Sequence, residues 1–224
     1  MKQKKLKMIK FALLMGAGVF AASQASADLI VNGSFETADL STPSAGGGSA
    51  GQWNYFYNGS NPLYGWTSSD NNTPLEVGLG SIYGVTGYDG NNVMELDSTV
   101  NVAVDQSLVT AGGTYQLSFL YALRSGVDPS SGTMSVVWDG IPITLTPTSS
   151  AMTLYTATVT GASGNNTLEF DGTGTSDSYG AILDNVSLNA VAPVPEPTTV
   201  LAGALMLLPF GVGAIRSLRK ERAA

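Results

Sequence analysis

The stretch ILDNVSL, residues 182–188, carries a single carboxylate among aliphatic residues. In an extended strand, Asp184 shares a face with Ile182, Val186 and Leu188. If this face packs against the core, the carboxylate is buried, which costs free energy unless a cation pairs with it or a proton neutralises it. Calcium takes its oxygen ligands from carboxylates and backbone carbonyls, so it would suit this position. The alternative is a hydrated position at the strand rim, and the spacing alone favours neither.

A second group of residues could form a polar cleft on the open face of a sheet. Its members are Glu76, Glu95, Asp97, Tyr121, Arg124 and Trp138. Glu95 and Asp97 would project from one face of their strand, about 7 Å apart. The carboxylates would accept hydrogen bonds from sugar hydroxyls, and Arg124 would donate them. A plainer alternative is a solvated face with one salt bridge, and the spacing favours it over the cleft.

The residue types limit the chemistry available to an enzyme. Residues 28–190 contain no histidine, cysteine or lysine. This excludes Ser-His-Asp triads, thiol nucleophiles, Schiff bases and histidine-bound zinc in that segment. A glycoside hydrolase would need two carboxylates roughly 5–9.5 Å apart, and Glu95 with Asp97 meets that distance. Nothing marks either one as a proton donor, so we expect no enzymatic activity.

The charge of the same segment is strongly negative. Fifteen acidic residues stand against one cation, Arg124, which gives a formal charge near −14. A nucleic-acid-binding protein needs basic surface to displace counterions, so this class is excluded. An acidic surface suits a soluble extracellular domain or one that holds divalent cations.

Alternating apolar and polar residues predict strands throughout residues 28–190. The sequence Asp139-Gly140 between two apolar runs predicts a β-hairpin. A loop rich in glycine, serine and aromatic residues is expected at 37–61. The expected strands are 29–31, 63–67, 75–78, 81–85, 93–97, 100–105, 114–124, 152–160, 167–171 and 180–189, with a further pair around the Asp-Gly turn. Many short strands without helical periodicity predict an all-β fold, a jelly-roll-like β-sandwich.

Three motifs in this order, VNGSFE, YDGNNVMEL and ILDNVSL, resemble those of galactose-binding-like jelly rolls. This group includes carbohydrate-binding modules of the families 4, 9 and 22 type. The resemblance implies affinity for polysaccharide. It also implies a structural Ca²⁺ that joins the first strand, a mid-chain loop and the last strand. By position, its ligands would be the carbonyls of Ser34 and Asn92 and the carboxylates of Glu36, Asp89 and Asp184.

Both ends of the chain carry export signals. Residues 1–27 have a basic start, an apolar stretch and an Ala-x-Ala site, which predict a secretory signal peptide. In the tail, residues 191–224, a proline-rich collar precedes an uncharged stretch (198–215) long enough for a transmembrane helix, followed by a basic cluster. Pro195, Glu196 and Pro197 resemble the PEP-CTERM sorting motif, which implies processing by an exosortase-type enzyme at the inner membrane.

These features predict an exported, non-enzymatic protein of the cell surface or extracellular matrix, membrane-anchored at least transiently. Residues 28–190 would form a calcium-stabilised domain with affinity for extracellular polysaccharide. The alternative is a structural or adhesive matrix protein without a sugar site. A carboxylate-dependent glycoside hydrolase comes third.

Overall fold

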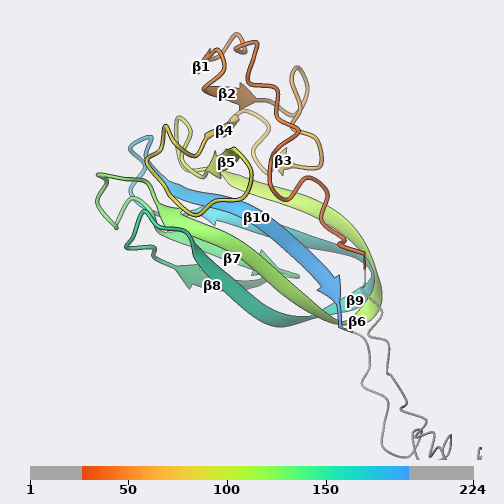
Figure 1. Ribbon diagram of the computed structural model, residues 1–224. Helices are drawn as coiled ribbons and strands as arrows, with labels where there is room; N and C mark the ends of the chain where they lie inside the picture. The colour runs from red at the N-terminus through yellow and green to blue at the C-terminus, as the bar shows by residue number, and fades with distance from the viewer. Residues whose placement is uncertain (1–26, 192–224) are drawn as a thin grey trace, which may run out of the picture.

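The protein is represented by a computed structural model that describes residues 27–191 (Figure 1). Every regular element within these residues is a β-strand. The strands are β1 (Gly48–Ser49), β2 (Trp53–Phe56), β3 (Thr67–Ser68), β4 (Leu75–Leu79), β5 (Asn92–Glu95), β6 (Ala103–Leu123), β7 (Met134–Trp138), β8 (Ile141–Leu145), β9 (Thr153–Gly172) and β10 (Ala181–Ala190). The predicted all-β class is confirmed for this part of the chain.

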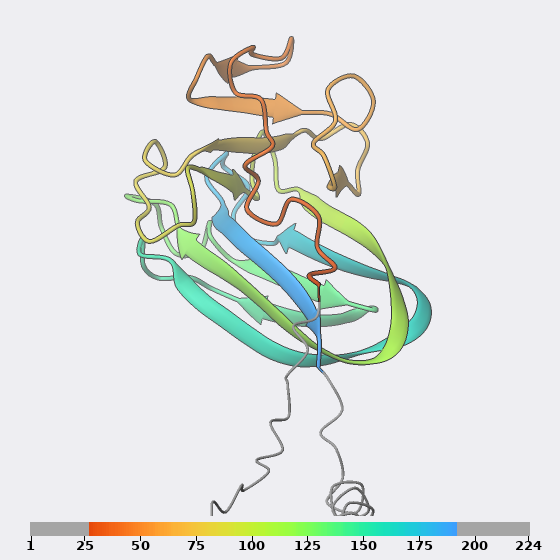
Figure 2. The ribbon, with the colours of Figure 1, turned by 45° about the vertical axis from the view of Figure 1, so that its right-hand side comes forward.

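Two long strands, β6 and β9, belong to both layers of the fold. They pair with each other along nearly their whole length in one continuous antiparallel register. In the first sheet, β1, β2, β4, β5 and β10 lead to the C-terminal half of β6 and the N-terminal half of β9. In the second sheet, β3 pairs with the N-terminal half of β6, while β7 and β8 extend from the C-terminal half of β9. Figure 2 shows both long strands curving at one end of the molecule. This arrangement is consistent with the predicted jelly-roll-like sandwich.

Glycines lie where the long strands bend. Gly112 and Gly113 have φ angles of 81° and 123°, and Gly164 on β9 has a φ angle of 114°. Residues with a Cβ atom rarely adopt these angles, so glycine is needed at this corner. The bend lets one strand pair serve two sheets.

Aromatic side chains fill the space between the sheets. Phe119 of the first sheet meets Phe170 of the second edge-on, with ring centroids 5.0 Å apart. Trp66 also contacts Phe170, at 6.1 Å, and its indole N–H donates to the Asn32 carbonyl. Buried aromatic rings dominate the energetics of such cores. The chain leading to β3 is therefore held against the sandwich.

The outer face of the first sheet is also covered, which the alternation did not predict. The segment before β5 folds over it and forms a second apolar cluster, in which Tyr83 and Val85 pack against Val93, Ala122 and Ile182. Both faces of β5 are consequently buried. The expectation of an open face carrying Glu95 and Asp97 is wrong, because both side chains are 0 % exposed.

A bulge in β10 changes which side chains share a face. The pairing with β6 shifts by one residue between Asp184 and Ser187, and Asn185 has a φ angle of 47°. A bulge inserts one residue and reverses the alternation beyond it. Ile182 accordingly packs in the outer cluster, whereas Val186 and Leu188 pack in the core between the sheets. The prediction of one common face for these residues and Asp184 is wrong. Of the two alternatives left open for Asp184, the structure shows the buried one, at 0 % exposure.

Other strand predictions have mixed outcomes. The Asp139-Gly140 hairpin is confirmed, with φ angles of 50° and 80° at the turn. Residues 29–31 and 81–85 form no strand, and the predicted loop 37–61 contains β1 and β2. Four predicted strands are parts of β6 and β9. Between residues 27 and 191 no helix could span a membrane. The predicted signal peptide and sorting tail, with Pro195, Glu196 and Pro197, lie outside the described residues.

Candidate functional site

Two glutamates face each other beneath the segment that covers the first sheet. Glu76 of β4 lies directly opposite Glu95 of β5, and Ile182 of β10 lies opposite Glu95 on its other side. Like charges directly opposite on neighbouring strands repel each other. Their exposed fractions are only 7 % and 0 %, so water does little to screen them. This position requires a counter-ion or a bound proton.

Arg124, at the end of β6, supplies the counter-ion. Its Nη1 atom donates to Oε2 of Glu95 at 2.8 Å, so the guanidinium and the carboxylate form an ion pair. The other Glu95 oxygen accepts from the Gly180 backbone N–H at 2.9 Å. The Tyr83 hydroxyl donates to Oε1 of Glu76 at 2.8 Å. Two carboxylates thus lie near one arginine, which within residues 27–191 pairs with Glu95 alone.

Burial, together with this shortage of positive charge, shifts the pKa values of the cluster. Burial, with the charge of Glu76 second, raises the pKa of Glu95 to about 8 despite the opposing effect of Arg124. Burial also raises the pKa of Glu76 and places that of Tyr83 well above its usual range. Burial disfavours the charge of Arg124, but Glu95 raises its pKa overall. At neutral pH the carboxylate pair therefore retains a proton for much of the time.

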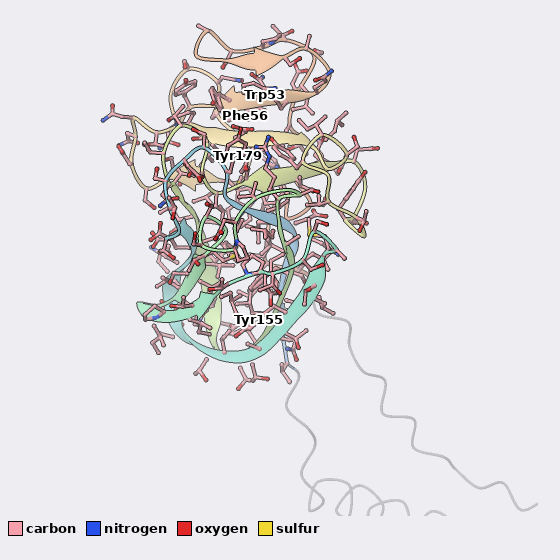
Figure 3. All side chains as sticks on the ribbon, turned by 90° about the vertical axis from the view of Figure 1, so that its left-hand side faces the viewer. Trp53, Phe56, Tyr155 and Tyr179 are labelled. Atoms are coloured by element: carbon pink, nitrogen blue, oxygen red, sulfur yellow. The ribbon has the colours of Figure 1, made fainter. Side chains whose placement is uncertain are left out.

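Arg124 lies between two tyrosine rings at the rim of a surface cavity. Its guanidinium carbon is 5.1 Å from the ring centre of Tyr83 and 4.6 Å from that of Tyr179. Tyr179 is 45 % exposed, while Tyr83 is buried. The cavity holds about 550 Å³, and its lining consists of Ile82, Tyr83, Gly84, Arg124, Ser125, Gly126, Val127, Asp128, Asp177 and Tyr179. Figure 3 shows Tyr179 beside the strands of the first sheet.

Asp97 fixes the loop that presents Tyr179. Its Oδ2 atom accepts from the backbone N–H groups of Asp177 and Ser178, at 2.8 and 3.1 Å. Asp177 in turn accepts from the Tyr179 N–H at 3.2 Å and from the Ser131 hydroxyl at 2.9 Å. Burial raises the pKa of Asp97, against the effect of these backbone donors. Asp97 therefore positions the rim of the cavity and does not line it.

The remaining two residues of the predicted cleft lie elsewhere. Tyr121 packs on the core between the sheets, with its ring 6.0 Å from that of Phe119. Trp138 is buried in the second sheet, where its indole N–H donates to the Thr160 carbonyl at 2.9 Å. The structure thus joins Glu76, Glu95 and Arg124, puts Asp97 behind them, and brings in Tyr83 and Tyr179. Sequence analysis missed these two tyrosines. Tyr83 fell within the predicted strand 81–85, and Tyr179 was one aromatic residue in a Ser-rich stretch.

The residues of the predicted calcium site are drawn toward one region. Asp184 accepts from the backbone N–H groups of Asp89 and Asn185, both at 2.6 Å. Glu36 accepts from the N–H groups of Asn91 and Asn92, both at 2.7 Å.

A buried carboxylate and two residues with positive φ angles mark this place. Burial, followed by the effects of Asp89 and Glu36, raises the pKa of Asp184 to about 7 despite two backbone donors. Asn32 and Phe35, on either side of Ser34, have φ angles of 54° and 58°. Among the described residues, no three carboxylate side chains converge tightly enough for a metal ion. The donor types still suit calcium, whose charge would stabilise ionised Asp184.

Comparison with known proteins gives limited similarities. No family model matches the chain. It is 33 % identical over 164 residues to the multifunctional-autoprocessing repeats-in-toxin of Vibrio vulnificus, a match covering 71 % of this chain and 3 % of the toxin. The protein of the same name from Vibrio cholerae serotype O1 is 35 % identical over 128 residues, covering 55 % of this chain and 3 % of that toxin.

Solved structures similar to this chain include two carbohydrate-binding modules. CBM35 from Paenibacillus barcinonensis is 22 % identical with a TM-score of 0.38, and the match covers 63 % of this chain and 100 % of the module. A family 35 module from Clostridium thermocellum is 14 % identical with the same TM-score, covering 57 % of this chain and 90 % of that module. The chain thus spans a small fraction of its curated relatives and is similar to carbohydrate-binding modules at low identity.

Proposed function

We propose that the protein binds extracellular polysaccharide without cleaving it, through the cavity beside Arg124. The observation that carries the proposal is Tyr179, an exposed ring stacked on a guanidinium at the rim of a polar cavity. A tyrosine face offers apolar contact to a sugar ring at low cost in side-chain entropy. Asp128 and Asp177 would accept from sugar hydroxyls, and Ser125 would donate or accept.

The charge of the cavity favours a neutral glycan. Arg124 is already paired with Glu95, while Asp128 and Asp177 both line the cavity. An anionic sugar would meet these two carboxylates without a free cation among the lining residues. Uncharged hydroxyls are therefore the better match.

The burial of the carboxylates supports a role without turnover. Glu95 and Asp97, the pair at glycosidase spacing, are 0 % exposed and accept from backbone N–H groups. A catalytic acid or base must reach the glycosidic oxygen or a water beside it. Neither side chain has that access, so the glycoside hydrolase alternative finds no support in this geometry.

Replacing Tyr179 with alanine is expected to reduce glycan binding at least tenfold, about 1.4 kcal/mol, because the stacking face is lost. A glycan array on the purified protein identifies the ligand, and calorimetric titration measures the change. We expect a wild-type Kd in the millimolar-to-micromolar range, about −4 to −8 kcal/mol. Tyr64→Ala is the control, since Tyr64 is 67 % exposed and does not line this cavity. Equal affinities of wild type and Tyr179→Ala would show that the glycan binds elsewhere on the protein. An array on which no glycan binds would favour a purely structural or adhesive protein.

We further propose that Ca²⁺ stabilises the domain through Glu36, Asp89 and Asp184, with the carbonyls of Ser34 and Asn92. The support is the full burial of Asp184 beside two other acidic residues, with an elevated pKa. A cation there would replace repulsion by attraction and would join the start, the middle and the end of the domain formed by residues 28–190.

Chelation is expected to lower the melting temperature. A ligand present at one hundred times its Kd stabilises the native state by about 2.7 kcal/mol, which for a domain of this size corresponds to roughly 5–11 °C. Asp184→Asn should abolish the difference between calcium and chelator, whereas Asp139→Asn, at an exposed turn, should retain it. Identical wild-type melting curves in calcium and chelator at matched ionic strength would exclude the metal.

The proposed route to the cell surface depends on the two ends of the chain. The signal peptide would be removed after Ala27, and an exosortase-type enzyme would process the tail at Pro195, Glu196 and Pro197 while the inner membrane holds it. The supporting observation is the order of motif, uncharged stretch and basic cluster. Mass spectrometry of the exported protein should find Asp28 at its N-terminus. An intact basic end on released protein would contradict the sorting proposal.

A further inference from the structure

Among the strand edges of the described fold are those of β1, β3, β8 and the N-terminal half of β9, and the first three are poor templates for further pairing. β1 and β3 have two residues each. β8 carries Pro142, which has no N–H to donate to a neighbouring strand. Short edges and prolines are common means by which proteins block unwanted strand pairing. The fourth edge, the N-terminal half of β9, has neither.

This fourth edge is long and regular. Residues 153–160 read TLYTATVT, with no charge, no proline and no glycine. They pair with β6 on one side in an unbroken register, whereas β7 joins β9 only from Leu168 onward. In Figure 2 this part of β9 lies beside β6, on the side away from β10. β-branched residues dominate the segment and favour extended pairing.

The backbone of this edge has free hydrogen-bonding groups. The Thr160 carbonyl accepts from Trp138, so it points away from β6. Antiparallel strands alternate the direction of successive backbone groups. Leu154, Thr156 and Thr158 therefore also turn their N–H and C=O groups outward, and no described residue pairs with them there. If a partner strand lay along this edge, these groups would form a new ladder of backbone hydrogen bonds with it.

The surroundings of the edge lack charge in a strongly acidic molecule. Residues 107–123 and 140–168 contain no aspartate, glutamate, lysine or arginine. Residues 28–190 nevertheless carry a formal charge near −14. Two copies of so acidic a domain repel each other in most relative orientations. The repulsion is smallest when both copies turn uncharged surface toward each other. The free edge lies within that surface, so charge directs a second copy to it.

We propose that residues 153–160 of β9 pair antiparallel with the same residues of a second copy, joining two first sheets into one. A two-fold axis makes such a contact self-complementary. Because the outward groups belong to the even-numbered residues, Thr156 faces its own counterpart and Leu154 faces Thr158. Threonine pairs across strands are favourable, and the 61 % exposed Leu154 gains an apolar neighbour. Tyr155, labelled in Figure 3, stacks on Phe119 with ring centroids 4.8 Å apart, and it would lose its remaining exposure in the dimer.

The first test measures mass against concentration. Analytical ultracentrifugation of the exported protein should show reversible dimers between about 10 µM and 1 mM, since one strand pair gives modest affinity. Thr156→Lys sets two like charges opposite each other, so it should weaken the dimer at least tenfold. Thr144→Lys, on the proline-bearing edge of β8, is the matched control and should leave the dimer unchanged. Both variants should melt as wild type does, because both side chains are exposed.

The second test uses the absence of cysteine from the chain. Directly opposed, hydrogen-bonded residues lie about 5.5 Å apart at their Cα atoms, within the range of a disulfide. Thr156→Cys should form a disulfide-linked dimer under mild oxidation much faster than Thr144→Cys. A monomer throughout the concentration range, or equal cross-linking of the two variants, overturns the proposal. A dimer that Thr156→Lys leaves intact also overturns it, because another surface would then form the contact.

Discussion

Replacing Arg124 with alanine is expected to lower the free energy of unfolding by about 3 kcal/mol at pH 9 and by about 1 kcal/mol at pH 5. Removing one partner of a buried ion pair leaves the other charge uncompensated. Glu95 is 0 % exposed, while the Arg124 side chain retains 25 % exposure, so the expected loss is at the lower end of the range for buried pairs.

The pH dependence follows from the state of Glu95. At pH 5 its carboxyl is protonated in wild type and variant, because its pKa is about 8. The variant then loses a hydrogen bond and the contacts with Tyr83 and Tyr179 only. At pH 9 wild-type Glu95 is ionised and paired. In the variant, Glu95 must either hold a proton at a pH where an exposed carboxyl is ionised, or stay ionised without a cation beside it. Either state costs free energy.

Urea unfolding at the two pH values measures the effect. Glu95→Gln and the double variant Arg124→Ala/Glu95→Gln complete a double-mutant cycle. The double variant should be more stable than Arg124→Ala at pH 9, because it no longer buries an unpaired carboxylate. An equal loss at both pH values would mean that Arg124 acts through packing alone. No loss at either would mean that the ion pair is irrelevant to the fold.

The sequence predicted several strands from their alternating residues and from the turn residues that flank them. The Asp139-Gly140 hairpin, β4, β5 and β10 all lie within two residues of their predicted positions. β6 and β9 were divided in the prediction, because the glycines at their bend look like turn residues. Local residue preference indicates a break there, whereas pairing between the two strands keeps both continuous.

The candidate site was predictable only in part, because its burial depends on a distant segment. Alternation placed Glu95 on the face away from the main core, which is correct, but could not show that Tyr83 and Val85 cover that face. The bulge at Asn185 likewise follows from pairing with β6 and leaves no mark in the local pattern. Polar residues on the non-core face of a strand thus indicate solvent only where nothing folds over the sheet.

In calcium-free buffer, the free energy of unfolding is expected to fall by up to about 7 kcal/mol between pH 5 and pH 8.5, because each of two buried carboxyls loses about 1.4 kcal/mol per pH unit until the pH passes its native pKa. Burial raises the pKa of Glu95 to about 8 and that of Asp184 to about 7, both far above their values in an unfolded chain. The native state therefore holds more protons than the unfolded state in this window, so raising the pH favours unfolding. The two protonated carboxyls stabilise the native state fully below about pH 4.5. This stabilisation is lost progressively as the pH rises to 7 for Asp184 and to 8 for Glu95. Most carboxylates have the opposite effect, because ion pairs lower their pKa values in the native state.

Scanning calorimetry from pH 5 to pH 9 in chelator tests this expectation. Glu95→Gln and Asp184→Asn should each reduce the slope, while Asp139→Asn, at an exposed turn, should leave it unchanged. General repulsion among surface carboxylates is screened by salt, so the slope should persist at about 1 M salt, where the Debye length is about 3 Å. A calcium ion bound at Asp184 would hold that carboxylate ionised and remove its share of the slope. Stability that rises with pH across this window would show that both carboxyls ionise at ordinary pH and that the charge balance around Arg124 differs from the one described.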